Sequence, residues 1–170
     1  VSLTLNAGEA HGLVGENGAG KSTLIKLLTG VYPLREGRIL WEGQPVSITC
    51  PEDAQRLGIC VIHQERTLVP SFSGVENAYL GRPYPTRFGL VDWNAMTRRV
   101  QETAERLGMT LNLRCPAGQL SPPQQTELEI VRAMLWDCRL LILDEPTASL
   151  TDREAERLFA LLHRLREQGT

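Results

Sequence analysis

The sequence has little excess charge and no long hydrophobic run. Its 18 lysines and arginines are balanced by 20 aspartates and glutamates, which gives a net charge of −2. Because general nucleic-acid-binding proteins normally carry a strongly basic face, this balance argues against that class. The apolar runs are as short as that of residues 140–143 or little longer, whereas a helix that crosses a bilayer needs roughly 20 residues. We therefore expect no nucleic-acid partner and no membrane-spanning segment.

Paired cysteine motifs and a signal peptide are also lacking. The cysteines are Cys50, Cys60, Cys115 and Cys138, and their spacing fits neither a zinc site nor a disulfide framework. This predicts reduced thiols in a cytosolic protein. The sequence has no initial methionine and no basic region followed by an apolar one. Because residues 1–5 alternate apolar and polar side chains, we expect the chain to begin inside a sheet and to be a fragment.

The sequence does contain an alternation of expected strands and helices, without internal repeats. Strands are expected at residues 1–5, 10–15, 59–62 and 139–143, and a hairpin over 37–49 with its turn near Glu42 and Gly43. Helices are expected at 21–29, 51–58, 73–81, 92–107, from 121 onward, and from 151 to a stop at Gly169. Such alternation indicates an α/β sheet. Residues 65–135 have a different pattern, which predicts a mostly helical insertion between core segments 1–64 and 136–170.

The segment GENGAGKST fits the phosphate-binding pattern G-x-x-x-x-G-K-[ST]. Its residues are Gly15, Glu16, Asn17, Gly18, Ala19, Gly20, Lys21, Ser22 and Thr23. Glycines let backbone N–H groups turn toward anionic oxygens, and the following helix begins with free N–H groups. In this pattern Lys21 reaches the β- and γ-phosphates and the Ser22 hydroxyl is a ligand of Mg²⁺. The alternative is a glycine-rich turn that contains Lys-Ser by chance, which the flanking strand and helix disfavour.

The apolar strand expected at 139–143 leads directly into Asp144 and Glu145. Ligands of doubly wound sheets bind at the carboxyl ends of strands, so we expect Asp144 near the Mg²⁺ ion, in contact with it through water. Glu145 is expected to polarise the attacking water as a general base. Taken alone, the pair is equally well explained as a solvated acidic turn. The phosphate loop in the same chain favours the catalytic interpretation.

The order of these elements resembles the ATP-binding subunit of an ABC transporter. After the phosphate loop come VIHQE at 61–65, the helical insertion, LS..Q from Leu120, and LLILDEPTASLT at 140–151. The segments HQE, LVP, ENAYLG and EPTASLTDRE are most similar to the tandem ATPase subunits of bacterial monosaccharide importers of the ribose, galactose and xylose type. The resemblance covers nearly the whole chain. It implies an α/β fold, a P-loop ABC-type ATPase core with an antiparallel β hairpin region and a helical subdomain, with residues 1–170 forming one truncated nucleotide-binding domain.

The resemblance assigns roles to further residues. Gln64 resembles the glutamine that meets Mg²⁺ and reports to the membrane partner; an exposed polar residue is the simpler alternative. Ser121 and Gln124 belong to the signature that faces the ATP held by a second unit. Residues 149–151 resemble the loop that touches the opposite ATPase domain, although Thr151 also reads as an ordinary helix cap. The helical insertion resembles the surface that grips the permease, with an ordinary helical subdomain as the alternative.

The signature departs from the family pattern at Pro122 and Pro123, where glycines are usual. The prolines suit a helix start, with Ser121 as the cap and Gln124 completing a capping box. They also remove two N–H donors from a site that would contact the γ-phosphate. We therefore expect ATP binding at residues 15–23 to be intact, and the partner site that this segment completes to be slow or silent.

Two residues of the family have no counterpart in this sequence. These are the aromatic residue that stacks on adenine and the histidine that contacts the γ-phosphate. His11, His63 and His163 do not match that position; we interpret His163 as an exposed helix residue and the other two as sheet-edge residues. We expect the fragment alone to bind ATP weakly and to hydrolyse it poorly.

The function that the sequence predicts is an ATP-binding and ATP-hydrolysing module of a carbohydrate importer, with Glu145 and Lys21 as catalytic residues. The implied partners are a second ATPase domain, as a head-to-tail dimer or tandem half, transmembrane permease subunits and, indirectly, a periplasmic sugar-binding protein. The implied location is peripheral, on the cytoplasmic face of the bacterial inner membrane. Two alternatives stay open: a regulatory half-site with a degenerate signature, and an ABC ATPase outside transport.

Overall fold

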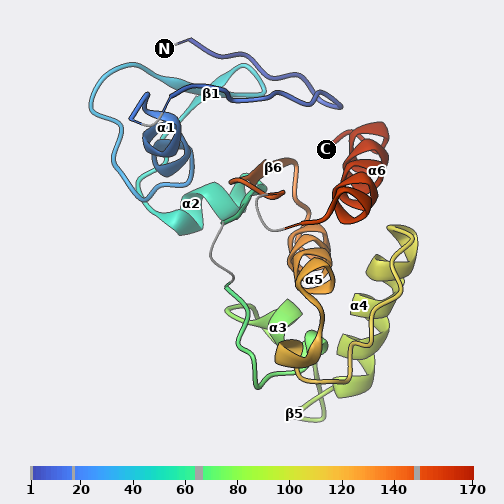
Figure 1. Ribbon diagram of the computed structural model, residues 1–170. Helices are drawn as coiled ribbons and strands as arrows, with labels where there is room; N and C mark the ends of the chain where they lie inside the picture. The colour runs from blue at the N-terminus through green and yellow to red at the C-terminus, as the bar shows by residue number, and fades with distance from the viewer. Residues whose placement is uncertain (1, 17, 64–66, 148–149) are drawn as a thin grey trace. The chain divides into compact units, whose positions relative to one another are not determined.

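The structure is a computed structural model that describes residues 2–16, 18–63, 67–147 and 150–170. The chain forms two compact units (Figure 1). The first unit consists of Val1–Val61, Cys138–Ile142 and Arg166–Thr170, and the second of Ile62–Asp137 and Leu143–Leu165. Each unit is described by itself below.

The first unit contains two helices, a hairpin and a two-stranded sheet. Its elements are α1 (Lys21–Leu28), β1 (Ile39–Trp41), β2 (Gln44–Val46), α2 (Pro51–Arg56), β3 (Ile59–Ile62) and β6 (Leu140–Leu143), and the last residues of β3 and β6 belong to the second unit. Strand β3 pairs with β6. A small core of Ile48, Ala54 and Ile59 is covered by partly buried residues that include Trp41 and Ile142.

The hairpin β1–β2 confirms the turn predicted at Glu42 and Gly43. Ile39 lies opposite Val46 and Trp41 opposite Gln44, which leaves a two-residue loop. Both loop residues have positive φ, 51° at Glu42 and 77° at Gly43. Such a loop matches the twist of the paired strands, so its glycine is explained by backbone conformation.

The second unit is mainly helical. Its elements are α3 (Gly74–Tyr79), β4 (Thr86–Arg87), β5 (Leu90–Val91), α4 (Trp93–Arg106), a 3₁₀ turn (Ala117–Gln119), α5 (Pro122–Leu135) and α6 (Asp152–Glu167), of which the last two residues belong to the first unit. Helices α3, α4 and α5 pack against one another. The predicted α4 face of Met96, Val100, Ala104 and Leu107 is fully buried. Among the described residues, no helix is both long and apolar enough to span a bilayer.

The helix ends follow the capping chemistry of the sequence. The carboxylate of Asp92 accepts a hydrogen bond from the Ala95 N–H at 2.9 Å, and the Glu154 carboxylate accepts from both the N–H and the hydroxyl of Thr151 at 2.8 Å. The predicted stops also hold, because Gly108 and Gly169 have φ of 70° and 91°. These contacts confirm the predicted bounds of α4 and α6 to within a residue or two.

The strands predicted at residues 1–5 and 10–15 are wrong for the described part of the chain. Residues 2–5 and 10–15 have no strand structure, and Leu3, Leu13 and Val14 are exposed by 48%, 47% and 93%. A strand forms only when a neighbour accepts its hydrogen bonds, and alternation in the sequence does not supply that neighbour. His11 is therefore not a sheet-edge residue; its Nε2 lies 3.2 Å from a Glu9 carboxylate oxygen.

Candidate functional site

The loop at residues 15–23 is shaped by two glycines and by the start of α1. Gly18 and Gly20 have φ of 84° and 94°, in the left-handed region that favours glycine. The Ala19 N–H donates to the Glu16 carbonyl at 3.1 Å, and the Leu24 N–H donates to the Gly20 carbonyl at 2.9 Å. The loop thus closes a turn and enters the helix directly. This arrangement presents small residues and helix N–H groups at one point, as an anion site requires.

The ammonium of Lys21 lies over this loop. It donates to the carbonyl oxygen of Gly15 at 2.5 Å and to that of Glu16 at 3.0 Å. The side chain is half-buried, whereas the neighbouring Ser22 and Thr23 are exposed. A positive charge and a free hydroxyl therefore flank the first turn of α1. The predicted Asn17 lies outside the described residues.

In the second unit, Asp144 and Glu145 follow the end of β6. The Asp144 N–H donates to the Ile62 carbonyl at 3.0 Å, which extends the pairing of β6 with β3 by one residue. Glu145 is exposed and has a φ of 50°. Left-handed backbone at a non-glycine residue is uncommon and concentrates at functional positions. The chain thus turns sharply at the residue predicted to be the general base, while the predicted Gln64 lies outside the described residues.

The predicted signature segment forms the start of α5. The exposed Ser121 occupies the cap position, and its N–H donates to the Gln124 Oε1 at 3.0 Å. Pro122 and Pro123 take the first two helical positions and bring no N–H groups. Gln125 ties the turn to the preceding segment, since its Nε2 donates to the Leu120 carbonyl at 2.9 Å. The segment is a helix N-terminus that lacks two donors.

The predicted contact loop at 149–151 is described only in part. Ser149 lies outside the described residues, and Thr151 forms the capping box of α6 with Glu154. The hydrogen bond from the Thr151 N–H holds the pKa of the Glu154 carboxyl below its usual value. The local contacts of Thr151 are those of a helix cap.

The structure therefore groups the predicted residues into three sets. One set is the loop at 15–23, which lies in the first unit; Asp144 with Glu145, and Ser121 with Gln124, lie in the second. Within the described ranges, no cluster of three or more His, Cys, Asp or Glu residues could hold a metal ion. None of the four cysteines is in a disulfide. His163 is exposed on α6, as predicted.

Two buried polar residues of the second unit escape sequence reasoning. The Asn77 side chain accepts from the Val69 N–H at 2.8 Å and donates to three carbonyls of the same loop, including that of Val69 at 3.0 Å. The Glu129 carboxylate accepts from the N–H and hydroxyl of Thr67 at 2.9 and 3.1 Å. Together they fix the chain that follows residue 66 onto α3 and α5. A lone polar residue within an apolar run was the available signal, in ENAYL and in LEIV.

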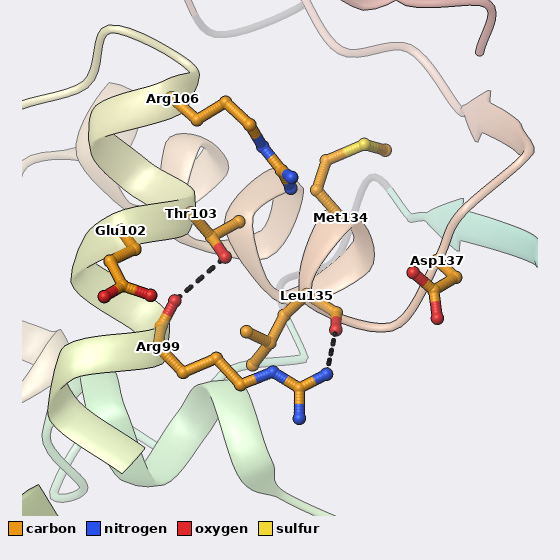
Figure 2. A pocket seen from close by; sticks show the side chains of 7 residues that line it. All are labelled: Arg99, Glu102, Thr103, Arg106, Met134, Leu135 and Asp137. Carbon is orange, nitrogen blue, oxygen red and sulfur yellow. Dashed lines mark hydrogen bonds between the residues drawn. The ribbon is translucent and has the colours of Figure 1, made fainter. Parts of the chain in front are cut away.

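A cavity of about 300 Å³ lies between α4 and the end of α5 (Figure 2), and none of the predicted site residues lines it. Its lining includes Arg99, Arg106 and Asp137. Arg99 donates to the Leu135 carbonyl at 3.4 Å, and its guanidinium lies over the Trp136 ring at 5.3 Å. Arg99 thus joins α4 to the end of α5, and we assign the cavity no ligand.

The sequence profile of the ABC transporter family matches residues 1–148. This chain belongs to the ABC transporter family. It is 48% identical over 170 residues to the ribose import ATP-binding protein RbsA of Chromobacterium violaceum. It is 47% identical over 169 residues to the ribose import ATP-binding protein RbsA 1 of Rubrobacter xylanophilus. Each alignment covers 99% of this chain but 34% of the relative. The ABC chain thus spans about a third of the length of these relatives.

Solved structures show the same ABC ATPase fold. The ADP conformation of MJ1267, an ATP-binding cassette of an ABC transporter, aligns with a TM-score of 0.84 at 25% identity. A nucleotide-free ATP-binding cassette from an ABC transporter aligns with a TM-score of 0.85 at 25% identity. Each alignment covers 99% of this ABC chain and 70% of the other chain. The predicted fold class, a P-loop ABC-type ATPase fold, is confirmed.

Proposed function

We propose that residues 15–23 bind the phosphates of ATP, and that the longer protein to which this chain belongs hydrolyses ATP to drive import of a monosaccharide of the ribose class. The observation that carries the proposal is the loop itself, in which two left-handed glycines deliver a lysine ammonium and the first turn of α1 to one place. The identity of 43–48% to ribose import ATP-binding proteins supports the sugar class.

In this proposal each set of residues has one task. The N–H groups of the loop and of the α1 N-terminus bind phosphate oxygens, and Lys21 leaves its two carbonyl partners to meet the β- and γ-phosphates. Glu145 orients a water and takes its proton as that water attacks the γ-phosphorus. Ser121, at the head of α5, faces the nucleotide of a second ATPase domain.

We propose the exposed Ser22 hydroxyl and the Asp144 carboxylate as ligands of Mg²⁺, because oxygen donors are the ones this ion prefers. Gln64 is proposed to complete this set. Bound with ATP, the ion would neutralise charge on the phosphates. The task of Ser22 and Asp144 would be to hold that ion.

The longer protein supplies the remaining parts. We propose that residues 1–64 and 136–170 belong to the ATPase core and that residues 65–135 form the helical subdomain that meets permease subunits. A second ATPase domain would pair head to tail with this one, on the same polypeptide or another, at the cytoplasmic face of the membrane. A periplasmic sugar-binding protein would act through the permease. Relatives about three times as long leave room for a tandem arrangement.

The test uses the full-length protein assembled with its permease in proteoliposomes. Lys21→Ala is expected to weaken ATP binding at least tenfold, because a charged hydrogen bond is worth about 1.5–3 kcal/mol. Lys26→Ala on the same helix is the matched control, since the Lys26 ammonium lies over the Tyr32 ring instead. Glu145→Gln is expected to keep ATP binding and to lose sugar-stimulated phosphate release, whereas Glu156→Gln, an exposed glutamate of α6, keeps both. Equal turnover in Glu145→Gln and Glu156→Gln would contradict the role of the base.

One observation favours a second candidate, a regulatory half-site that holds ATP with little hydrolysis. Two of the first helical N–H groups of α5 are absent at Pro122 and Pro123. The loss of these two donors would affect the ATP site of the second ATPase domain, which this segment is proposed to complete. The two candidates separate on single-turnover phosphate release from the assembled pair, because a regulatory site retains its nucleotide unhydrolysed.

A further inference from the structure

The hairpin β4–β5 lies at the end of the second unit where α4 begins (Figure 1). Thr86 lies opposite Val91 and Arg87 opposite Leu90, so the connection consists of Phe88 and Gly89 alone. Phe88 is 94% exposed and Leu90 75% exposed. Residues 86–91 are called the tip hairpin below. The sequence pattern did not predict the tip hairpin, and the proposed ATPase chemistry does not involve it.

The backbone at Phe88 is unusual for an aromatic residue. Its φ is 53°, and Gly89 follows at 80°. Two-residue turns of this kind favour asparagine, aspartate and glycine at the first position, because a bulky side chain is disfavoured in the left-handed region. Within the described residues, the ring of Phe88 meets the Arg87 guanidinium at 5.5 Å. A disfavoured residue with an almost fully exposed ring is explained by a contact outside the chain.

The tip hairpin stands on a rigid base. The Asp92 N–H donates to the Pro85 carbonyl at 2.8 Å, which continues the pairing of the two strands. Below it, the Tyr84 ring lies 6.2 Å from that of Tyr79, which meets the Trp136 ring edge-on at 5.4 Å. Phe88 and Leu90 are therefore held outward by a packed aromatic cluster. A preorganised apolar tip loses little freedom when it binds.

The charge of this segment is positive. Residues 81–91 contain Arg82 and Arg87 and no acidic residue, a charge of +2. The next residue, Asp92, has its carboxylate engaged by the Ala95 N–H as the cap of α4. Tyr84 and Trp93 flank the hairpin and are exposed by 44% and 52%. Side chains that bind a membrane surface are arranged in the same order: apolar residues such as Phe and Leu enter the membrane, and Trp, Tyr and Arg lie behind them at the level of the headgroups.

We propose that the tip hairpin binds the surface of a bilayer that contains anionic phospholipid. Phe88 and Leu90 enter the boundary between headgroups and acyl chains, Tyr84 and Trp93 lie at headgroup level, and Arg87 pairs with lipid phosphates. The contact orients the ATPase domain on the membrane and adds to its hold on the permease. It involves a different segment from the nucleotide loop and stands or falls independently of the proposed ATPase function.

The test measures binding of the full-length ATPase protein, without its permease, to sedimented vesicles. Vesicles of phosphatidylcholine alone are compared with vesicles that also contain phosphatidylglycerol. The double variant Phe88→Asn with Leu90→Thr is expected to bind the anionic vesicles about tenfold more weakly, because two large side chains no longer leave water. Arg87→Gln is expected to lose about fivefold, and only on anionic vesicles. Phe159→Gln, at an exposed aromatic residue of α6, is the control and keeps full binding.

Folding is checked separately by thermal unfolding. Asparagine accepts the left-handed backbone at position 88, so the variant is expected to unfold at the wild-type temperature or above it. The proposal is overturned if the wild-type protein ignores anionic vesicles or if the double variant binds them as well as the wild type does. It is equally overturned if the double variant keeps vesicle binding but fails to assemble with the permease in detergent, because the hairpin then recognises protein.

Discussion

Asp53 illustrates how a single side chain of the first unit is fixed by local contacts. One of its carboxylate oxygens accepts from the N–H and hydroxyl of Thr49 at 2.9 and 2.8 Å, and from the Cys50 N–H at 3.3 Å. These bonds, the Thr49 N–H first, lower the pKa of Asp53 from 3.8 to about 2. The ionised carboxylate thus closes the N-terminus of α2.

The stability of the protein at acid pH should depend on the ionisation of the Asp53 carboxylate. Because the folded pKa is depressed, its stabilising contribution is fully present above pH 3.8 and is lost as the pH falls toward about 2. Asp53→Asn is expected to lower the urea midpoint at neutral pH, and the difference from the wild type should vanish across that acid window. Glu156→Gln, at an exposed position, serves as the control. A difference that persists unchanged at pH 2 would refute this account of Asp53.

Sequence reasoning reached some residues of the candidate site and not others. Lys21 and Ser22 could be located because a phosphate loop prescribes both spacing and backbone. The left-handed φ of Glu145 could not, since it depends on how β6 leaves the sheet. Asn77 and Glu129 were missed because their partners are carbonyl and N–H groups of a loop whose path no periodicity encodes. Backbone partners chosen by tertiary packing are the part that a sequence leaves unspecified.

Among the elements, the start of α5 carries the sharpest consequence. Replacing Pro122 and Pro123 by glycine restores two N–H donors at the head of the helix, each worth about 1.5–3 kcal/mol toward a charged oxygen. ATPase turnover of the assembled complex is therefore expected to rise, by a factor of about ten or more per donor that reaches the γ-phosphate.

The matched control for this pair is Pro51→Gly, which removes the proline at the start of α2. Like the variant at Pro122 and Pro123, Pro51→Gly loses a proline that preorganises the first turn of a helix. It is expected to leave ATPase turnover unchanged. Turnover is measured well below the unfolding temperature, because glycine adds freedom to the unfolded chain. If turnover in the Pro122→Gly, Pro123→Gly variant does not exceed that of the wild type, the loss of donors is not what limits the site.

Helices were easier to predict than strands in this chain. Helices α4 and α6 have caps, apolar stripes and glycine stops that all lie in the helix or directly beside it. The bounds of each helix were therefore predicted to within a residue or two. The expected strand at residues 10–15 failed because a strand requires a partner that the sequence does not name. The hairpin β4–β5 was missed for a different reason: its turn begins with Phe88, which is not one of the residues usual in such turns.

At the scale of the whole protein, stability should depend on nucleotide. If the full-length protein binds ATP in its folded form only, ATP at about 100 times Kd adds about 2.7 kcal/mol to the free energy of unfolding. For a domain of 150–250 residues, each kcal/mol corresponds to about 2–4 °C. Thermal unfolding with and without ATP and Mg²⁺ is therefore expected to shift upward by several degrees. The Lys21→Ala variant should show a clearly smaller shift, and an equal shift would place the binding elsewhere.

Trp136 gives the helical unit an optical reporter. Its indole N–H donates to the Ala78 carbonyl of α3 at 3.0 Å, its ring lies under the guanidinium groups of Arg82 and Arg99, and it ends α5. Fluorescence of this indole senses nearby charge and solvent. In a variant that lacks the other two tryptophans, Trp41 and Trp93, a movement of α3, α4 or α5 would therefore change its emission. The movements of the helical unit during the proposed ATPase cycle could then be followed in real time without any attached dye.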